Sequence, residues 1–196
     1  MIDLSRLIQA RQAGWIARRR DFHRHPELAF DEIRTAGIIA DELARLGLEV
    51  QTGIGRTGVI GLLEGDGDGP TVLVRADMDA LPVQEENETG YVSQNPGAMH
   101  ACGHDGHMTI ALAVAEALSE QRARVKGRVK FVFQPAEEIA RGARAMIDDG
   151  ALQTPAPDVA LGLHLWNELP IGTVAVTDGA IMAGASDFTL VVSGRG

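Results

Sequence analysis

The chain has 196 residues, of which 45% are hydrophobic, 4% are aromatic and 23 are glycine. This length can form one substantial hydrophobic core, and the composition is typical of an α/β protein with many tight turns. The formal net charge is −9. That charge argues against a nucleic-acid partner, because phosphate binding needs a basic face and the arginines at 18–20 are better explained as the solvated face of a helix.

Cys102 is the only cysteine, which rules out an internal disulfide bond and a Cys-x-x-Cys redox motif. The first residues lack the apolar core of a signal peptide. No apolar run approaches the roughly 20 residues that a membrane span requires. We therefore expect a cytoplasmic protein without a membrane partner.

Hydrophobic periodicity predicts two helices in the first part of the chain. One covers 3–25 and ends at Pro26, and the other covers 31–47. His23 and His25 lie at the end of the first helix. Because cations are favoured at helix C-termini, we expect capping or surface positions for these histidines and not metal binding.

Three β-like runs follow, at 48–52, 59–64 and 71–76. The Asp-Gly repeat at 65–70 predicts a hairpin or a tight loop between the last two runs. The stretch 53–58 matches G-x-G-x-x-G. It precedes a β-like run, however, whereas a dinucleotide-binding fingerprint must open the helix that receives the pyrophosphate, so a Rossmann-type cofactor site is disfavoured.

The stretch 99–107 concentrates metal-ligand residue types that have little packing value. The loop 84–99 leads into it, and a buried helix is predicted at 109–121 directly afterwards. The stretch therefore lies at a helix N-terminus and is typical of a metal site. Its candidate ligands are His100, Cys102, His104, Asp105 and His107.

The remainder of the chain alternates strands and helices. A buried strand is predicted at 129–133, a helix at 140–149 and another strand at 159–163. The continuous apolar run 72–74 is typical of a strand covered on both faces. The whole pattern predicts an α/β fold with three αβα layers around a mostly parallel sheet.

Candidate site residues occur at four places, each directly after a predicted strand or before a predicted helix. In a parallel sheet such positions meet at one edge, so residues far apart in the sequence can share a pocket. One cluster alone would be weak evidence, but their joint placement favours a common site. The four clusters are Asp77 with Asp79, Cys102 with His104, Glu137 with Glu138, and His164.

A thiolate, imidazoles and carboxylates suit Zn²⁺ or a similar first-row ion, and several carboxylates favour two ions in one site. Two such ions can hold a water molecule, lower its pKa and polarise a substrate carbonyl. Neighbouring residues of an extended chain point to different sides. One of Glu137 and Glu138 could thus bind metal while the other takes the proton of the water.

Several stretches are similar to the motifs of the dinuclear metallopeptidase and aminoacylase superfamily, in the branch with hippurate hydrolase, indole-acetyl-amino-acid hydrolases and N-acyl-amino-acid deacylases. The Cys-Gly-His-Asp form of the ligand motif is highly specific for this branch. The resemblance covers essentially the whole chain. The matching stretches are 23–28, 57–59, 75–82, 99–107, 134–138 and 162–164.

The resemblance implies hydrolysis of the amide bond of N-acyl amino acids or small peptides. It implies two divalent ions as cofactors, zinc or manganese, with cobalt or nickel as alternatives. Glu137 would be the general base, and Asp77 and Asp79 would support catalysis, Asp79 by orienting a ligand. His100 and His107 take no ligand role, and His107 is expected to cap the following helix. The implied metal ligands are Cys102, His104, Glu138 and His164.

The chain also departs from the family pattern. The resemblance implies that 1–185 is the N-terminal part of the catalytic domain, and that 186–196 is the strand that enters an inserted dimerisation domain. In the family the catalytic domain resumes after the insertion and supplies a last ligand histidine. We therefore expect an incomplete site in this chain, a small-molecule substrate, and a homodimer or higher oligomer for the full-length form.

Two principal hypotheses follow. The first is a metal-dependent amidohydrolase, or the portion of one that bears most of its site. The alternative is a metal-binding but catalytically silent domain that acts through partner contacts. A Rossmann-type oxidoreductase is a third possibility, which the β-like setting of the glycine pattern disfavours.

Overall fold

The structure is a computed structural model that describes residues 4–184, 186 and 188–195. It contains two compact units, Met1–Leu165 and Trp166–Gly196. The first unit holds every helix and strand assigned to the described residues. The start of the first predicted helix at Asp3 lies outside those residues.

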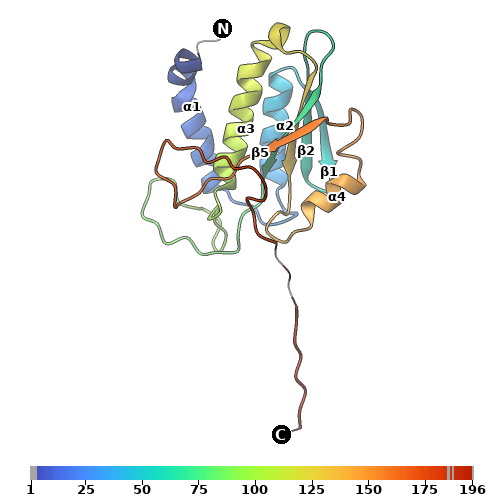
Figure 1. The fold of residues 1–196 in the computed structure, drawn as a ribbon. Helices are drawn as coiled ribbons and strands as arrows, with labels where there is room; N and C mark the ends of the chain where they lie inside the picture. Colours follow the sequence, from blue (N-terminus) through green and yellow to red (C-terminus); the bar gives the residue numbers. More distant parts are fainter. Residues whose placement is uncertain (1–3, 185, 187, 196) are drawn as a thin grey trace. The chain divides into compact units, whose positions relative to one another are not determined.

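A five-stranded sheet forms the centre of the first unit, in the order β1-β2-β4-β3-β5 (Figure 1). β3 runs parallel to β4 and to β5, whereas β2 runs antiparallel to β1 and to β4. The α/β class is confirmed, and the sheet is mixed because β2 turns back from β1 through a tight turn at 55–57. The strands are β1 (Glu49–Ile54), β2 (Gly58–Glu64), β3 (Thr71–Asp77), β4 (Arg128–Gln134) and β5 (Val159–Gly162).

Helices cover both faces of the sheet (Figure 1). On one face lie α1 (Leu4–Arg24), α2 (Ile33–Arg45) and α3 (His104–Ser119), and on the other lies α4 (Gly142–Asp148). α3 begins earlier than the predicted residue 109, so the end of the histidine-rich stretch forms its first turn. None of the described helices is both long and apolar enough to cross a membrane.

The alternation of side chains along β4 divides the core in two. Phe131 and Phe133 are fully buried and pack with residues of α1, α2 and α3, whereas Val132 points to the opposite face and packs with Met146 of α4. β4 is thus covered on both sides, as its continuous apolar run indicates. This double cover fixes the strand whose end carries the two candidate glutamates.

The expected hairpin between β2 and β3 is wrong, because β4 lies between these strands. The alternative prediction, a tight loop, fits what is seen. The loop 65–70 wraps around the start of β4, where the N–H of Gly65 donates to the carbonyl of Gly127 at 2.9 Å. A Cβ on Gly127, whose φ is +77°, would lie 2.2 Å from the carbonyl oxygen of Pro70, so the close approach requires glycine.

The G-x-G-x-x-G stretch forms the turn between β1 and β2 and opens no helix, so it lacks the setting that a dinucleotide-binding fingerprint requires. Its glycines serve close packing instead. A Cβ on Gly55 or on Gly58 would lie 2.7 Å from side-chain atoms of Met146. The turn therefore sits directly against α4.

The second unit has no strand among the residues that the structure describes. The predicted strand at 186–196 includes Asp187 and Gly196, which lie outside those residues, as does Ala185. The domain boundary between 185 and 186 stays a prediction.

Candidate metal centre

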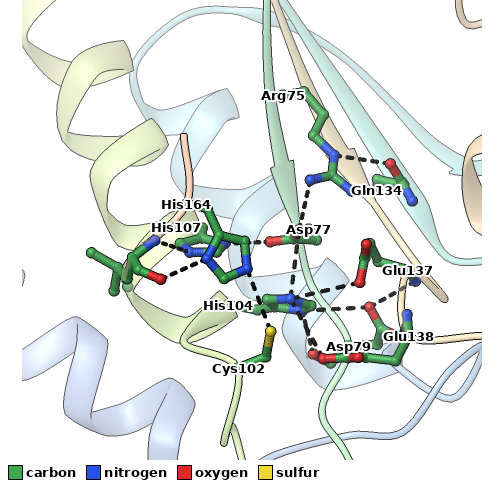
Figure 2. Close-up of polar contacts among 12 residues, drawn as sticks. Arg75, Asp77, Asp79, Cys102, His104, His107, Gln134, Glu137, Glu138 and His164 are labelled. Atoms are coloured by element: carbon green, nitrogen blue, oxygen red, sulfur yellow. Dashed lines mark hydrogen bonds and ion pairs between the residues drawn. The ribbon is translucent and has the colours of Figure 1, made fainter. Parts of the chain in front are cut away.

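The carboxyl ends of the parallel strands β3, β4 and β5 meet the first turn of α3 at one edge of the sheet. Figure 2 shows that the side chains singled out from the sequence gather there from four separate segments. The structure brings all seven together. They are Asp77, Asp79, Cys102, His104, Glu137, Glu138 and His164.

His104 is the fully buried first residue of α3 and lies at the centre of the group. Its Nδ1 lies 2.8 Å from the backbone carbonyl oxygen of Asp79, which can only accept, so Nδ1 carries the proton. Nε2 is buried and has no hydrogen-bond partner among the described residues. An unpaired buried ring nitrogen is costly unless a ligand binds it.

Carboxylates surround this nitrogen. Nε2 of His104 lies 3.5 Å from Asp77 Oδ2 and 3.6 Å from Glu138 Oε1. Burial lowers the pKa of His104, but its contact with Asp79 and the negative charges of Asp77 and Glu138 outweigh burial and raise that pKa. The pocket therefore favours a positive charge next to Nε2, which a bound cation would supply.

Asp79 fixes the turn that carries the two glutamates. One carboxylate oxygen accepts the backbone N–H of Glu137 at 2.9 Å, and the other accepts that of Glu138 at 3.0 Å. Because Asp79 also bonds His104 through its backbone carbonyl, one residue holds both the candidate histidine and the candidate glutamates. This placement agrees with a supporting position, and its catalytic role stays a prediction.

Glu137 and Glu138 lie in a turn, so the expectation of an extended chain with side chains on different sides is wrong. Both carboxylates point toward His104 Nε2, at 3.9 Å and 3.6 Å (Figure 2). They differ in exposure, with 39% of the Glu137 side chain exposed and 17% of Glu138. Oε1 of Glu138 is buried without a hydrogen-bond partner among the described residues, and burial raises the pKa of its carboxyl.

Cys102 and His164 complete the other side of the group. The Cys102 sulfur lies 3.4 Å from Nε2 of His164, whose Nδ1 donates to the backbone carbonyl of Leu165 at 2.6 Å. Burial and the negative charges of the neighbouring carboxylates, Glu138 first, raise the pKa of Cys102 to about 12. The thiolate is disfavoured by the protein alone, and a divalent cation would reverse that balance.

Asp77 is almost completely buried and accepts two short hydrogen bonds. Oδ1 lies 2.6 Å from Nδ1 of His107, and Oδ2 lies 2.6 Å from a guanidinium nitrogen of Arg75. Burial raises its pKa, but the His107 hydrogen bond and the positive charges of His104 and Arg75 dominate and lower the pKa to about 2. Asp77 therefore stays ionised next to the candidate ligands.

His107 does not cap α3, so that prediction is wrong. It is the fourth residue of the helix, and its Nε2 accepts the backbone N–H of Leu165 at 2.9 Å. The other ring nitrogen bonds Asp77, so both ring nitrogens of His107 already have hydrogen-bond partners, and the residue would have to lose one of them to bind a metal. His107 joins the end of β3 to the segment that carries His164.

Three groups of side chains place potential ligand atoms within 4.8 Å of one another. One of them depends on His107, whose two ring nitrogens are already bonded. The thiol, imidazoles and carboxylates are the donors that zinc and similar ions use, so the residues fit a metal. The groups are Cys102–His104–His164, His104–Glu137–Glu138 and Asp77–His104–His107.

His23 is neither a cap nor a surface residue, which corrects the expectation for that helix end. It is buried, with Nδ1 2.7 Å from Asp105 and Nε2 3.2 Å from Glu85. His25 bonds the backbone carbonyl of Asp21 at the end of α1, as expected for such a position. Neither histidine belongs to a candidate metal group among the described residues.

Contacts of two neighbours of the site, Arg75 and His107, were not predicted from the sequence. Arg75 is held by the side chain of Gln134 at 2.9 Å and directs its guanidinium to Asp77. His107 was already among the candidate ligands, and its place on the same helix face as His104 follows from their spacing of three residues. The contact of His107 with Leu165 has no such local signal.

The chain is similar to proteins of known name and to solved structures. An N-acetylcysteine deacetylase of Bacillus subtilis is 42% identical over 179 residues, which are 91% of this chain and 47% of the relative. An IAA-amino acid hydrolase of Arabidopsis thaliana is 43% identical over 183 residues, covering 93% of this chain and 41% of that protein.

A solved structure from Bacillus subtilis, a dinuclear metal-binding peptidase of the M20 family, has a TM-score of 0.82 at 42% identity. The match covers 87% of this chain and 47% of that protein. The chain thus spans about half the length of the relatives it matches. Residues 73–192, more than half of the chain, match one family, and the chain belongs to peptidase family M20/M25/M40.

Proposed function

We propose that this chain is part of a metal-dependent amidohydrolase that cleaves the amide bond of N-acyl amino acids or small peptides. The observation that carries the proposal is the buried, unpaired Nε2 of His104 among the oxygens of Asp77 and Glu138. Such a nitrogen among carboxylates fits a divalent cation. The names of the relatives support this substrate class, because they denote a deacetylase and an amino-acid conjugate hydrolase.

The proposed metal ligands are Cys102, His104, Glu138 and His164. Their chemistry suits two divalent ions, zinc or manganese, with cobalt or nickel as alternatives. Bound metal supplies a water molecule of lowered pKa and polarises the substrate carbonyl. The dinuclear M20 peptidase of Bacillus subtilis supports a count of two ions.

Glu137 is the proposed general base. Its carboxylate lies beside Glu138 but is more exposed, so it can reach water and substrate from the open side of the pocket. It would take a proton from the attacking water and return it to the nitrogen of the leaving amine. Asp79 holds the backbone of both glutamates, and Asp77 holds His107 and Arg75, so both aspartates would act as support.

The wider assembly is part of the same proposal. Segment 1–185 would belong to the catalytic domain, 186–196 would lead into a dimerisation domain, and a last ligand histidine would follow residue 196. Family membership and the half-length match to the relatives support this assignment. The full-length protein would be a homodimer or higher oligomer and would be located in the cytoplasm.

The deciding experiment uses the protein extended past Gly196 to the length of its relatives. Metal content is measured on the purified protein, and hydrolysis of hippurate and N-acetyl amino acids is followed by release of the free amino acid. Two bound ions with turnover that chelation abolishes are expected. Bound metal without turnover on any of these substrates would instead support the catalytically silent alternative.

A further inference from the structure

Glu32 is a fully buried acidic side chain outside the candidate metal groups. It directly precedes α2, and its carboxylate reaches across to the loop that follows β4. One oxygen accepts the backbone N–H of Ala136 at 2.9 Å, and the other accepts the hydroxyl of Thr57, which lies in the turn between β1 and β2. Three segments distant in sequence thus meet at one carboxylate.

Ala136 has a φ of +48°, in the left-handed region that non-glycine residues rarely adopt. Such a conformation persists only when surrounding contacts hold it. Its carbonyl oxygen accepts the N–H groups of Arg141 and Gly142 at 3.2 Å and 3.1 Å, and its own N–H is held by Glu32. Ala136 is therefore bonded on both sides of its peptide backbone.

The next two residues are the candidate base and ligand, and their N–H groups are held by Asp79. Three successive backbone N–H groups, those of residues 136–138, are thus bonded by two buried carboxylates, Glu32 and Asp79. Asp79 binds the backbone of the two glutamates themselves, whereas Glu32 binds the backbone of Ala136, where the chain turns after β4. The two carboxylates therefore contact the backbone at three consecutive residues that include both candidate glutamates.

We propose that Glu32 is a positioning residue, which holds Ala136 in its left-handed conformation and thereby directs Glu137 and Glu138 toward His104. The part of this inference that concerns metal rests on the proposed function. The hydroxyl of Thr57 and the backbone N–H of Ala136 donate to the Glu32 carboxylate, and neither donor is charged. The positioning role therefore requires hydrogen-bonding shape at this position and not negative charge. This distinction makes the inference testable by substitution.

Glutamine has the same shape, and its carbonyl oxygen can still accept from Ala136 while its amide donates to Thr57. Glu32→Gln should therefore preserve the turn, whereas Glu32→Ala should release it. Lys130 supplies the control, because it is equally buried and its ammonium bonds the backbone carbonyls of Gln153 and Pro155 beside β4. Lys130→Met removes a buried polar anchor without touching residues 134–141.

The probe is Co²⁺, titrated into the 196-residue chain and followed by its visible absorption and by the charge-transfer band of a cobalt–thiolate bond. Exchange of the Ala136 amide is measured by NMR on the same proteins without metal. Glu32→Ala should bind Co²⁺ roughly 10- to 100-fold more weakly, as expected when a partner that orients ligands is lost. Its Ala136 amide should exchange faster, while Glu32→Gln should resemble the wild type in both measurements.

Lys130→Met should lower the melting temperature and leave Co²⁺ affinity and Ala136 exchange unchanged. Equal losses of affinity in Glu32→Ala and Lys130→Met would overturn the inference, since both would then report general destabilisation. Unchanged affinity and unchanged Ala136 protection in Glu32→Ala would overturn it as well. If Glu32→Ala does not fold, Glu32→Asp, whose shorter side chain cannot span both partners, takes its place with the same expected direction.

A wild-type 196-residue chain that takes up no Co²⁺ would show that metal binding needs the proposed ligand beyond residue 196, and the proposed function would still be decided on the extended protein. The inference would then be decided by the Ala136 amide alone. Protection in the wild type that is lost in Glu32→Ala and retained in Glu32→Gln would support the positioning role, and equal exchange in all three proteins would refute it.

Discussion

Nδ1 of His107 lies 2.6 Å from Oδ1 of Asp77, and both side chains are almost completely buried. Because the second nitrogen of His107 accepts the N–H of Leu165, the pair couples the end of β3 to the segment after β5. The parallel pairing of β3 and β5 brings these segments near each other. The His107–Asp77 pair then sets the position of the residues that follow the strands, His164 among them.

Replacing His107 by phenylalanine keeps the ring volume and removes both contacts. The Asp77 carboxylate loses a hydrogen-bond donor, and the Leu165 N–H loses its acceptor. We expect a loss of roughly 1–3 kcal/mol in the free energy of unfolding, measured by urea denaturation, because buried polar groups are left without partners. His25→Phe, near the end of α1, is the matched control and should change stability far less. Equal stability of the two variants would contradict the linking role.

Substitution Glu137→Gln separates metal binding from proton transfer in the extended protein. The amide cannot accept the proton of water, whereas the proposed ligands remain. Metal content should equal that of the wild type, and kcat for hippurate or N-acetyl amino acids should fall roughly 10²- to 10⁴-fold. Turnover comparable to that of the wild type would remove Glu137 from the role of base.

Substitution Cys102→Ala should weaken metal binding, and proton release gives a sharper test than affinity alone. Since the pKa of Cys102 is raised to about 12, its thiol is protonated at neutral pH and must lose the proton to bind metal. Calorimetric titration with Zn²⁺ in buffers of different ionisation enthalpy should show fewer protons released by the variant. The same proton count and affinity in both proteins would exclude Cys102 as a ligand.

The buried His23 makes a contribution to stability that depends on pH. The hydrogen bond to Asp105 is the largest influence on His23 and raises its pKa, and the contact with Glu85 raises it further. Burial and the positive charge of Arg19 lower the pKa, but the net pKa is raised. A raised folded-state pKa gives stability that is fully present below the unfolded value of about 6.5 and is lost as pH rises through the folded value.

The urea midpoint of the wild type should therefore fall as the pH rises from below about 6.5 to above the folded-state pKa of His23. His23→Gln has no titrating ring and should show a flatter profile over the same range, with lower stability on the acidic side. A variant profile parallel to that of the wild type would show that the pH dependence arises elsewhere.

Much of the candidate site could be predicted because its residues follow strand ends. Asp77, Glu137 and His164 come after apolar runs whose β character is local, and parallel strands bring such positions to one edge whatever their order in the sheet. The helix N-terminus that carries His104 was likewise visible from the alanine-rich run behind it. These signals lie within a few residues of the side chains they predict.

What could not be predicted depends on contacts between distant segments. The insertion of β4 between β2 and β3 is decided by long-range pairing, so the Asp-Gly repeat was compatible with a hairpin that does not form. The turn at Glu137 and Glu138 depends on Asp79 and Glu32, whose carboxylates arrive from other elements. Burial of His23 depends on Asp105 and Glu85 in the same way.

The position of β5 leads to a prediction about the behaviour of the 196-residue chain in solution. It is the last strand in the sheet order, and all four of its residues are exposed. Val159 and Leu161 therefore stand beside a row of backbone groups that pairs with no further strand among the described residues. Exposed apolar edges promote pairing between copies of a chain. Light scattering of the 196-residue chain should rise steeply with concentration, and Leu161→Lys should reduce that rise.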